Sequence, residues 1–307
     1  MIRELIHKLR PSSARTLLFE LVKELNYLQR SDRHISALQA DLLPFIEQVP
    51  RIEEWTAPRI EEYLSRLRVG ARRRDNLRDS FVRISRFARR RGVLPEDKIS
   101  EAEKIPKIKP GHDVVTWSPA EAQLLLESIA PRWVPCEAIG LFAGLRRSEI
   151  FRLDWSAFKW EQRDRDGELA PIIAVTRRIA RKIRVDRLVP ILPNLLTWLE
   201  PYRGRLGPLY SAQFKTIENA HSIEMTRVRN ATGLPRKDNA NRHSFGSYRL
   251  AIVKNYEQVA LEMGTSPRKV RENYNDPKSE LEAMRYFALR APQLDNVIPL
   301  SLALEFK

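Results

Sequence analysis

The chain is poor in several residues and patterns that mark common classes of protein. It has one cysteine, Cys136, among 307 residues, which excludes an internal disulfide and a metal site built from several thiolates. No Gly-rich phosphate loop, no apolar run long enough to span a bilayer and no signal peptide are present. The histidines lack the spacing of metal ligands; they are residues 7, 34, 112, 221 and 243. We therefore expect a cytoplasmic protein that uses no metal, nucleotide or membrane.

What the chain does have is positive charge. Lys and Arg number 54 against 39 Asp and Glu, which gives a formal net charge of +15. Apolar residues make up 43% of the chain, so it is able to fold around real cores and is not a disordered polyelectrolyte. Such a balance favours a polyanionic partner, most often nucleic acid. The alternative is a basic protein whose charge only keeps it in solution.

The positive charge is concentrated in one amphipathic segment near the N-terminus. Residues 76–91 place Leu77, Phe81, Ile84 and Phe87 on one helical face. Arginine can neutralise DNA phosphates, and this segment holds more of it than solubility requires. The alternative is a solvated surface. We predict contacts with double-stranded DNA from seven arginines of this segment and of the residues just before it: Arg72, Arg73, Arg74, Arg78, Arg83, Arg86 and Arg90.

The apolar patterns divide the chain into two domains. Residues 1–100 are predicted to be a helical domain, and 101–117 an exposed linker, because that stretch lacks an apolar period and contains proline. A second domain, 118–290, begins at Ser118-Pro119-Ala120-Glu121, a capping box. Residues 291–307 form an apolar tail.

The second domain is predicted to be mainly helical. Its pattern is helical over 118–160, and helices are also expected at 194–202, 216–230, 243–253, 256–263, 267–274 and 278–290. Residues 171–176 and 185–192 are rich in β-branched and aliphatic residues and predict a pair of strands. The expected fold class is therefore mainly α with a small antiparallel sheet.

Two arginines and a tyrosine in the second domain are the strongest candidates for chemistry. A phosphodiester under attack gains negative charge, and Arg146 and Arg242 offer planar donor forks for its oxygens. Preorganised charge of this kind is usually the largest catalytic contribution. Tyr274 offers a hydroxyl nucleophile that nearby cations help to ionise. Two alternatives stay open: Arg242 could pair with Glu149, and Tyr274 could be a core side chain.

Four segments resemble, in order and spacing, the boxes of the tyrosine recombinase (phage integrase) family. AGLRRSEIFRLDW holds Arg146, RKIRVDRLVPI holds Lys182, NANRHSFGSYRLA holds Arg242, and LEMGTSPRKVRENYND holds Tyr274. Of the rival tyrosines, Tyr248 and Tyr256, neither lies at the family spacing. The resemblance spans most of residues 10–290, and the basic N-terminal region looks like the family's core-binding domain.

The resemblance implies a role for each matched residue. Tyr274 would attack the scissile phosphate and form a 3′-phosphotyrosyl link, while Arg146 and Arg242 would hold the non-bridging oxygens. Lys182 would protonate the leaving 5′ hydroxyl, and Glu149 would support the first arginine. The basic hairpin would add DNA contacts from Arg181 and Arg184. Because the hairpin lacks its usual turn glycine, one of its arginines could stand in the place of Lys182.

Two positions depart from the family's pattern. Asn239 stands where a histidine is expected, and Thr265 where a histidine or tryptophan is expected. An amide or a hydroxyl can hydrogen-bond a phosphate oxygen, but neither accepts a proton at neutral pH. General acid–base help contributes about 10² to 10⁴-fold. We therefore expect slower cleavage, or compensation by His243 or His221, although His243 is interpreted mainly as a packed helix residue.

The family resemblance also implies how the protein assembles. It predicts a homodimer on each DNA site and a homotetramer in the synapse, with the tail 291–307 docking onto a neighbouring subunit. It suggests a prokaryotic, phage or mobile-element origin. We expect no separate arm-site domain, because the sequence starts with the core-binding region. Two other functions stay open: a catalytically attenuated or inactive DNA-binding relative, and a type IB topoisomerase-like enzyme.

Overall fold

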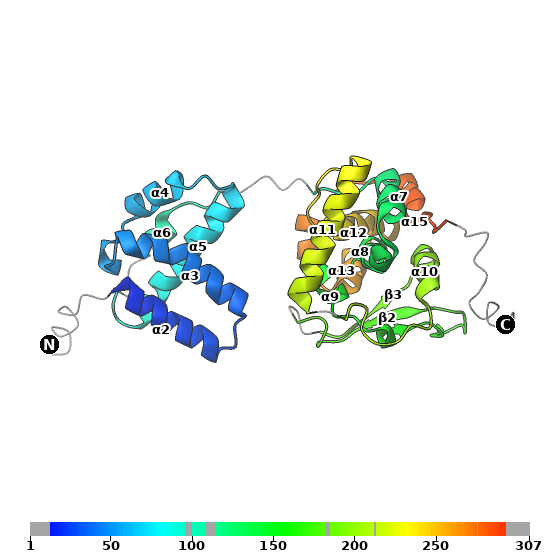
Figure 1. The fold of residues 1–307 in the computed structure, drawn as a ribbon, viewed down its shortest axis with the longest axis horizontal. Coiled ribbons are helices and arrows are strands. Elements are labelled where there is room, and N and C mark those ends of the chain that lie inside the picture. The colour runs from blue at the N-terminus through cyan, green and yellow to red at the C-terminus, as the bar shows by residue number, and fades with distance from the viewer. Residues whose placement is uncertain are drawn as a thin grey trace, which may run out of the picture. The chain divides into compact units, whose positions relative to one another are not determined.

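The structure is a computed structural model that describes residues 13–95, 100–108, 114–181, 185–211, 213–274 and 276–292. The chain divides into two compact units, residues 1–111 and 112–307 (Figure 1). Both units are mainly helical, and the second also contains a three-stranded antiparallel sheet. The predicted fold class is therefore confirmed. No helix in the described ranges has the length and apolar character needed to cross a membrane.

The first unit is a bundle built around a long helix, α5. Its elements are α2 (Ala14–Tyr27), α3 (Asp32–Gln48), η1 (Ile52–Glu54), α4 (Ala57–Arg66), α5 (Ala71–Arg90) and α6 (Glu101–Lys104). Helix α5 packs against α2, α3, α4 and α6. Phe81 of α5 meets Phe45 and Trp55 edge-on, with ring centroids 5.0 and 5.4 Å apart. Each such pair adds about 0.5–1.5 kcal/mol beyond the burial of its area.

The structure corrects the predicted linker in this region. Residues 100–108 belong to the first unit, because Ala102 and Ile105 are buried in its core. Ser100 and Glu103 form a reciprocal capping box that begins α6. The apolar positions are only two, so their pattern is too short to be recognised as a helix in the sequence. Helix α5 also begins at Ala71, earlier than predicted, so Arg72, Arg73 and Arg74 are helical.

The second unit surrounds a buried helix, α8 (Figure 1). Every residue from Pro135 to Ala143 is buried, and α8 packs against α7, α10 and α12. The helices are α7 (Pro119–Ser128), η2 (Pro131–Trp133), α8 (Val134–Ala143), α9 (Arg147–Ile150), η3 (Trp155–Ala157), α10 (Pro193–Leu199), η4 (Glu200–Tyr202), α11 (Phe214–Thr232), α12 (Ala240–Val253), α13 (Tyr256–Met263), α14 (Pro267–Asn273) and α15 (Glu280–Phe287).

The helical pattern predicted over 118–160 is broken in the structure. Gly144 ends α8 with φ +63°, and a Cβ there would meet the ring of Phe245 at 2.3 Å. Only glycine fits such a left-handed, crowded position, so the chain turns sharply before α9. The capping box predicted at Ser118 is confirmed, since its Oγ accepts from the backbone of Glu121 and that carboxylate accepts in return.

The predicted strand pair is confirmed and gains a third strand. Strands β2 (Ile172–Val175) and β3 (Arg187–Pro190) pair antiparallel, with Ile173 opposite Val189. The additional strand, β1 (Phe158–Lys159), lies on the other side of β2 and within the stretch that was predicted to be helical. On β3 the alternation places the charged Arg187 inside and leaves the apolar Leu188 62% exposed. This is the reverse of the usual placement, and it arises because Arg187 pairs with the buried Glu149.

Candidate functional site

Arg146 is held at the turn between α8 and α9. Its backbone N–H donates to Glu149 Oε2 (3.1 Å), and its Nη1 donates to Oε1 of the same carboxylate (3.0 Å). Its Nη2 donates to the carbonyl of Gly264, which follows α13 (2.9 Å). The side chain is still 19% exposed. Two side-chain hydrogen bonds and one from the backbone therefore fix Arg146 in place, and its exposed part can contact an anion.

Glu149 is the buried centre of this arrangement, and its main partner was not predicted from the sequence. Arg187 of β3 donates from Nη2 to Glu149 Oε2 at 2.6 Å, and both side chains are only 3% exposed. Burial raises the pKa of Glu149, but hydrogen bonds and charge from Arg187 and Arg146 more than offset this, so the pKa is lowered. The sequence signal for Arg187 was its inward position in the strand, two residues before Val189.

Arg242 of α12 is the second predicted arginine, and it is 6% exposed. Its Nη1 donates to the carbonyl of Gly144, and its Nε donates to the hydroxyl of Tyr274 at 3.3 Å. Within the described ranges it bonds no carboxylate, so the alternative pairing with Glu149 is wrong. Burial and the charge of Arg146 lower its pKa to about 10. Its Nη2 is buried with no hydrogen-bond partner among the described residues.

Tyr274 lies at the end of α14, against the face of α12 that carries Arg242. A Cβ on Gly246 would lie 2.8 Å from the Cβ of Tyr274, so this glycine lets the two segments approach closely. Ser247 Oγ donates to the Tyr274 carbonyl (2.8 Å). The His243 ring packs on the tyrosine ring at 5.0 Å, and its Nδ1 lies 2.8 Å from the Asn273 carbonyl. The backbone of Tyr274 is thus fixed while its hydroxyl faces Arg242.

The two departures from the family's pattern lie on segments of the same site. Asn239 is exposed, has φ +57° and caps α12 one turn before Arg242. Thr265 is half-buried and directly follows Gly264, the residue whose carbonyl binds Arg146. Within the described ranges neither side chain forms a hydrogen bond. Both are therefore available to a ligand, and neither can act as a base.

Other predicted site residues fall outside this cluster. Lys182 and Arg184, like the tail beyond residue 292, lie outside the described residues. Arg181 is exposed in the connection between β2 and β3. His221, proposed as a possible replacement for a missing histidine, is 1% exposed and bonds Glu137 of α8. It is therefore sealed from any DNA phosphate, and this suggestion is wrong.

His221 belongs instead to a buried group that the sequence did not bring together. Ligand-type atoms of Cys136, Glu137 and His221 lie within 4.8 Å of one another. Glu137 Oε1 lies 2.6 Å from His221 Nε2, and Oε2 accepts from Asn241 Nδ2 at 2.7 Å. Burial raises the Cys136 pKa well above its ordinary value, which disfavours a thiolate ligand. These contacts tie α8, α11 and α12 together next to Arg242.

The predicted DNA-binding arginines of α5 fall into two groups. Arg78 is 8% exposed, and its Nε donates to the Ile105 carbonyl (2.6 Å), so it is a structural residue and the prediction for it is wrong. The other side chains are at least partly exposed, and several contact the first unit itself: Arg73 pairs with Asp41, Arg83 lies against His34, Arg86 pairs with Glu103, and Arg90 pairs with Glu24. Arg72 is exposed and Arg74 half-buried.

The arrangement of these helices around the small sheet is the fold of the tyrosine recombinases, as solved structures show. The Tn1549 transposon integrase in complex with circular intermediate DNA matches with a TM-score of 0.63 and 15% identity, over 89% of this chain and 98% of that one. A lambda integrase dimer bound to a COC′ core site matches with a TM-score of 0.61 and 14% identity, over 93% and 99%.

These identities are low, so the likeness establishes the fold. No protein-family model matches the sequence, and no curated protein does. The fold implied by the resemblance of the four short boxes is thereby confirmed. The roles of the individual residues are a separate question, which the geometry of Arg146, Arg242 and Tyr274 addresses.

Proposed function

We propose that the chain is a site-specific DNA recombinase that cuts and rejoins DNA through a 3′-phosphotyrosyl intermediate. The observation that carries this proposal is the orphaned Nη2 of Arg242 beside the Tyr274 hydroxyl. A buried cationic donor without a partner is costly, and an anion that binds it removes the cost. A DNA phosphate placed there would lie beside a nucleophile.

In the proposed reaction, the two arginines hold the non-bridging oxygens of the scissile phosphate. Tyr274 Oη forms a bond to phosphorus, and the bond from phosphorus to the 5′ oxygen breaks. The tyrosine loses its proton to water, with the phenolate stabilised by the hydrogen bond from Arg242. The 5′ oxygen takes a proton from Lys182. A 5′ hydroxyl of a partner duplex reverses the same steps, because the phosphotyrosyl link conserves the bond energy.

Two features support a protein built to act on DNA in this way. The first unit presents exposed arginines on α5, and the second holds the two arginines and the tyrosine. The solved relatives with the same fold are described in complex with DNA, one of them as a dimer on its site. By analogy we propose a homodimer on each site of this protein and a homotetramer in the synapse.

A second candidate is a catalytically attenuated DNA-binding relative. The observation that favours it is the pair Asn239 and Thr265, whose side chains lie on the segments of the site but transfer no protons at neutral pH. Such a protein would still bind the phosphate through Arg146 and Arg242 but would cleave DNA slowly or not at all. The type IB topoisomerase-like alternative shares the chemistry and would differ by relaxing supercoiled DNA as a monomer.

The test is a pool of duplexes nicked next to each candidate phosphate, so that cleavage releases a short fragment and traps the covalent complex. We expect a DNA-linked product with the natural protein on a denaturing gel and none with Tyr274→Phe. DNA binding with no covalent product, over long incubation and across the pool, would instead support the attenuated relative.

A further inference from the structure

A cavity of about 500 Å³ lies on the first unit, along the basic side of α5. Its lining is mostly cationic, and it also contains two carboxylates: Arg78, Asp79, Arg83, Arg86, Arg90, Lys107 and Glu103, with Val82. The charges come from α5 and from the segment 100–108 that follows it. The cavity therefore has the character of an anion-binding site, and the carboxylate of Glu103 is part of its lining.

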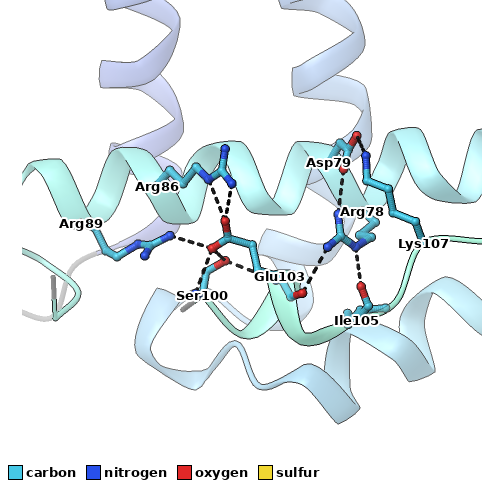
Figure 2. Close-up of polar contacts among 8 residues, drawn as sticks. All are labelled: Arg78, Asp79, Arg86, Arg89, Ser100, Glu103, Ile105 and Lys107. Atoms are coloured by element: carbon cyan, nitrogen blue, oxygen red, sulfur yellow. Dashed lines mark hydrogen bonds and ion pairs between the residues drawn. The ribbon is translucent and has the colours of Figure 1, made fainter. Parts of the chain in front are cut away.

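Glu103 is bound by Arg86, which lines the cavity, and by the neighbouring Arg89 of α5 (Figure 2). Its Oε1 accepts from Arg86 Nε at 2.8 Å, and its Oε2 accepts from Arg89 Nη2 at 2.7 Å. Ser100 adds bonds from its hydroxyl (2.7 Å) and backbone N–H (3.0 Å) to Oε2. One carboxylate thus takes donors from two arginines and a cap, which resembles the way a phosphate takes several donors.

The rest of segment 100–108 is fastened along the same helix. Arg78 donates to the carbonyls of Ile105 (2.6 Å) and Glu103 (3.2 Å), as Figure 2 shows. Lys107 pairs with Asp79 at 2.7 Å, and the backbone N–H of Ile108 donates to Asp75 at 3.0 Å. These bonds hold the Glu103 carboxylate against the arginines instead of leaving it mobile in solvent.

Glu103 stays charged over the whole physiological range. Its partial burial would raise the pKa, but hydrogen bonds from Ser100 and Arg86 prevail and lower it to about 2. The carboxylate is therefore a permanent anion on a surface whose other members are mainly cations. Its side chain is 18% exposed, and that of Arg86 is 59% exposed, so a polyanion in solution can reach this pair.

We propose that a backbone phosphate of DNA binds at Arg86 and Arg89, and that Glu103 is an internal competitor for this site. The DNA partner rests on the proposed function, whereas the competition rests on the contacts of Glu103 alone. When a phosphate takes the two arginines, the carboxylate moves away and segment 100–108 loses its attachment there. Glu103 accordingly weakens DNA binding, and only a phosphate positioned to contact both arginines displaces it.

The proposal predicts a gain of affinity on removal of one carboxylate. Glu103→Gln keeps the shape of the side chain and removes the negative charge that competes with a phosphate for Arg86 and Arg89. The full-length protein should then bind a duplex of random sequence about 5- to 20-fold more tightly at low salt. The slope of log K against log salt should steepen by about 1, since one neutralised phosphate contributes about 0.9. Fluorescence anisotropy of labelled duplex measures both.

The control is Glu62→Gln, which removes an ion-paired carboxylate from α4 of the same unit, where Glu62 pairs with Arg66. It should change affinity by less than about twofold, as an exposed pair contributes little. In the Arg86→Gln background, the gain from Glu103→Gln should fall by at least half. An equal change in the two glutamate variants, or an unchanged salt slope in Glu103→Gln, would overturn the proposal.

Thermal melts check that each variant is folded. If Glu103→Gln unfolds, Ser100→Ala serves instead, because it removes one donor that holds the carboxylate and leaves both arginines. It should give a smaller gain of the same sign, and no gain overturns the proposal. Failure here is distinct from failure of the proposed function: DNA binding without a gain rejects only the competition, whereas no binding by any variant rejects both.

Discussion

The Nε of Arg242 lies 3.3 Å from the hydroxyl of Tyr274, with the donor on α12 and the acceptor at the end of α14. The arginine is 6% exposed and its remaining nitrogen, Nη2, has no partner among the described residues. This pair brings together the proposed nucleophile and a buried arginine whose Nη2 has no partner among the described residues. The proposed function depends on it more than on any other contact.

Arg242→Gln removes the charge of this cation and the donor toward Tyr274. We expect the rate of covalent complex formation to fall by at least about 10²-fold, the size of effect seen when one preorganised donor to a developing anion is lost. Duplex binding should stay within about threefold, because Arg242 is one buried contact among many exposed cations. Single-turnover cleavage and anisotropy measure the two quantities. A parallel loss of binding and cleavage would contradict the assigned role.

Anions should stabilise the second unit through the same arginine. Burial and the charge of Arg146 lower the pKa of Arg242 to about 10, which means that its charged form is destabilised. An anion bound beside it would offset this effect. Sulfate is expected to raise the melting temperature of the natural protein more than that of Arg242→Gln. Arg249→Gln, which removes an arginine of α12 paired with Glu262, is the control for general salt effects. Equal shifts in all three proteins would argue against an anion site.

Breaking the buried pair of Glu149 and Arg187 should destabilise the second unit. Both side chains are 3% exposed, and removal of Arg187 leaves the buried Glu149 with Arg146 as its cationic partner. Arg187→Leu is expected to cost about 3–5 kcal/mol in the free energy of unfolding. Adding Glu149→Gln to that variant should recover part of the loss in urea unfolding. Additive losses would show that the two residues do not act as a pair.

Acid should destabilise the first unit partly through Glu103. Its folded pKa is about 2, below its ordinary value of 4.5. A depressed carboxyl pKa contributes stability that is fully present above the ordinary value and is lost as pH falls through the folded value. Melting temperatures between pH 5 and pH 2, an interval set by roughly these two pKa values, should therefore fall less steeply for Glu103→Gln than for the natural protein. Identical slopes would mean that the carboxylate is not held by its partners.

Restoring histidine tests the two departures from the family's pattern. Asn239→His with Thr265→His supplies groups able to exchange protons, and cleavage should rise by about 10-fold or more, within the range of acid–base catalysis. Asp238→His, one residue away on the exposed turn, is the matched control and should leave the rate unchanged. If the double variant cleaves no faster, the native pair already suffices or the positions do not face the phosphate.

Much of the site could be predicted because its residues follow local patterns. The positions of Arg146, Arg242 and Tyr274 depend on a glycine turn, a helix start and a helix end, which leave signals in the sequence. The strand pair was also predicted, from β-branched runs. The partnership of Arg187 with Glu149 could not be, because it joins residues that are 38 positions apart, and a charged side chain on the inner face of a strand ordinarily argues against burial.

For the arginines of α5, the sequence predicted more DNA-binding residues than the structure supports. Composition predicted one DNA-binding face, but it could not distinguish Arg78, which is buried against the Ile105 carbonyl, from Arg86, which is exposed and paired. The distinction depends on segment 100–108, whose two buried apolar residues are too few to show a helical period. Long-range polar contacts of this kind have no local sequence pattern.

The most direct test of the account is to identify the amino acid that becomes linked to DNA. The covalent complex formed on nicked duplex is digested, and the peptide that carries nucleotide is mapped by mass spectrometry. We predict a phosphodiester link at Tyr274, with the adduct lost in Tyr274→Phe and strongly reduced in Arg242→Gln. An adduct on Tyr248 or Tyr256, or one that persists in Tyr274→Phe, would contradict the proposed nucleophile.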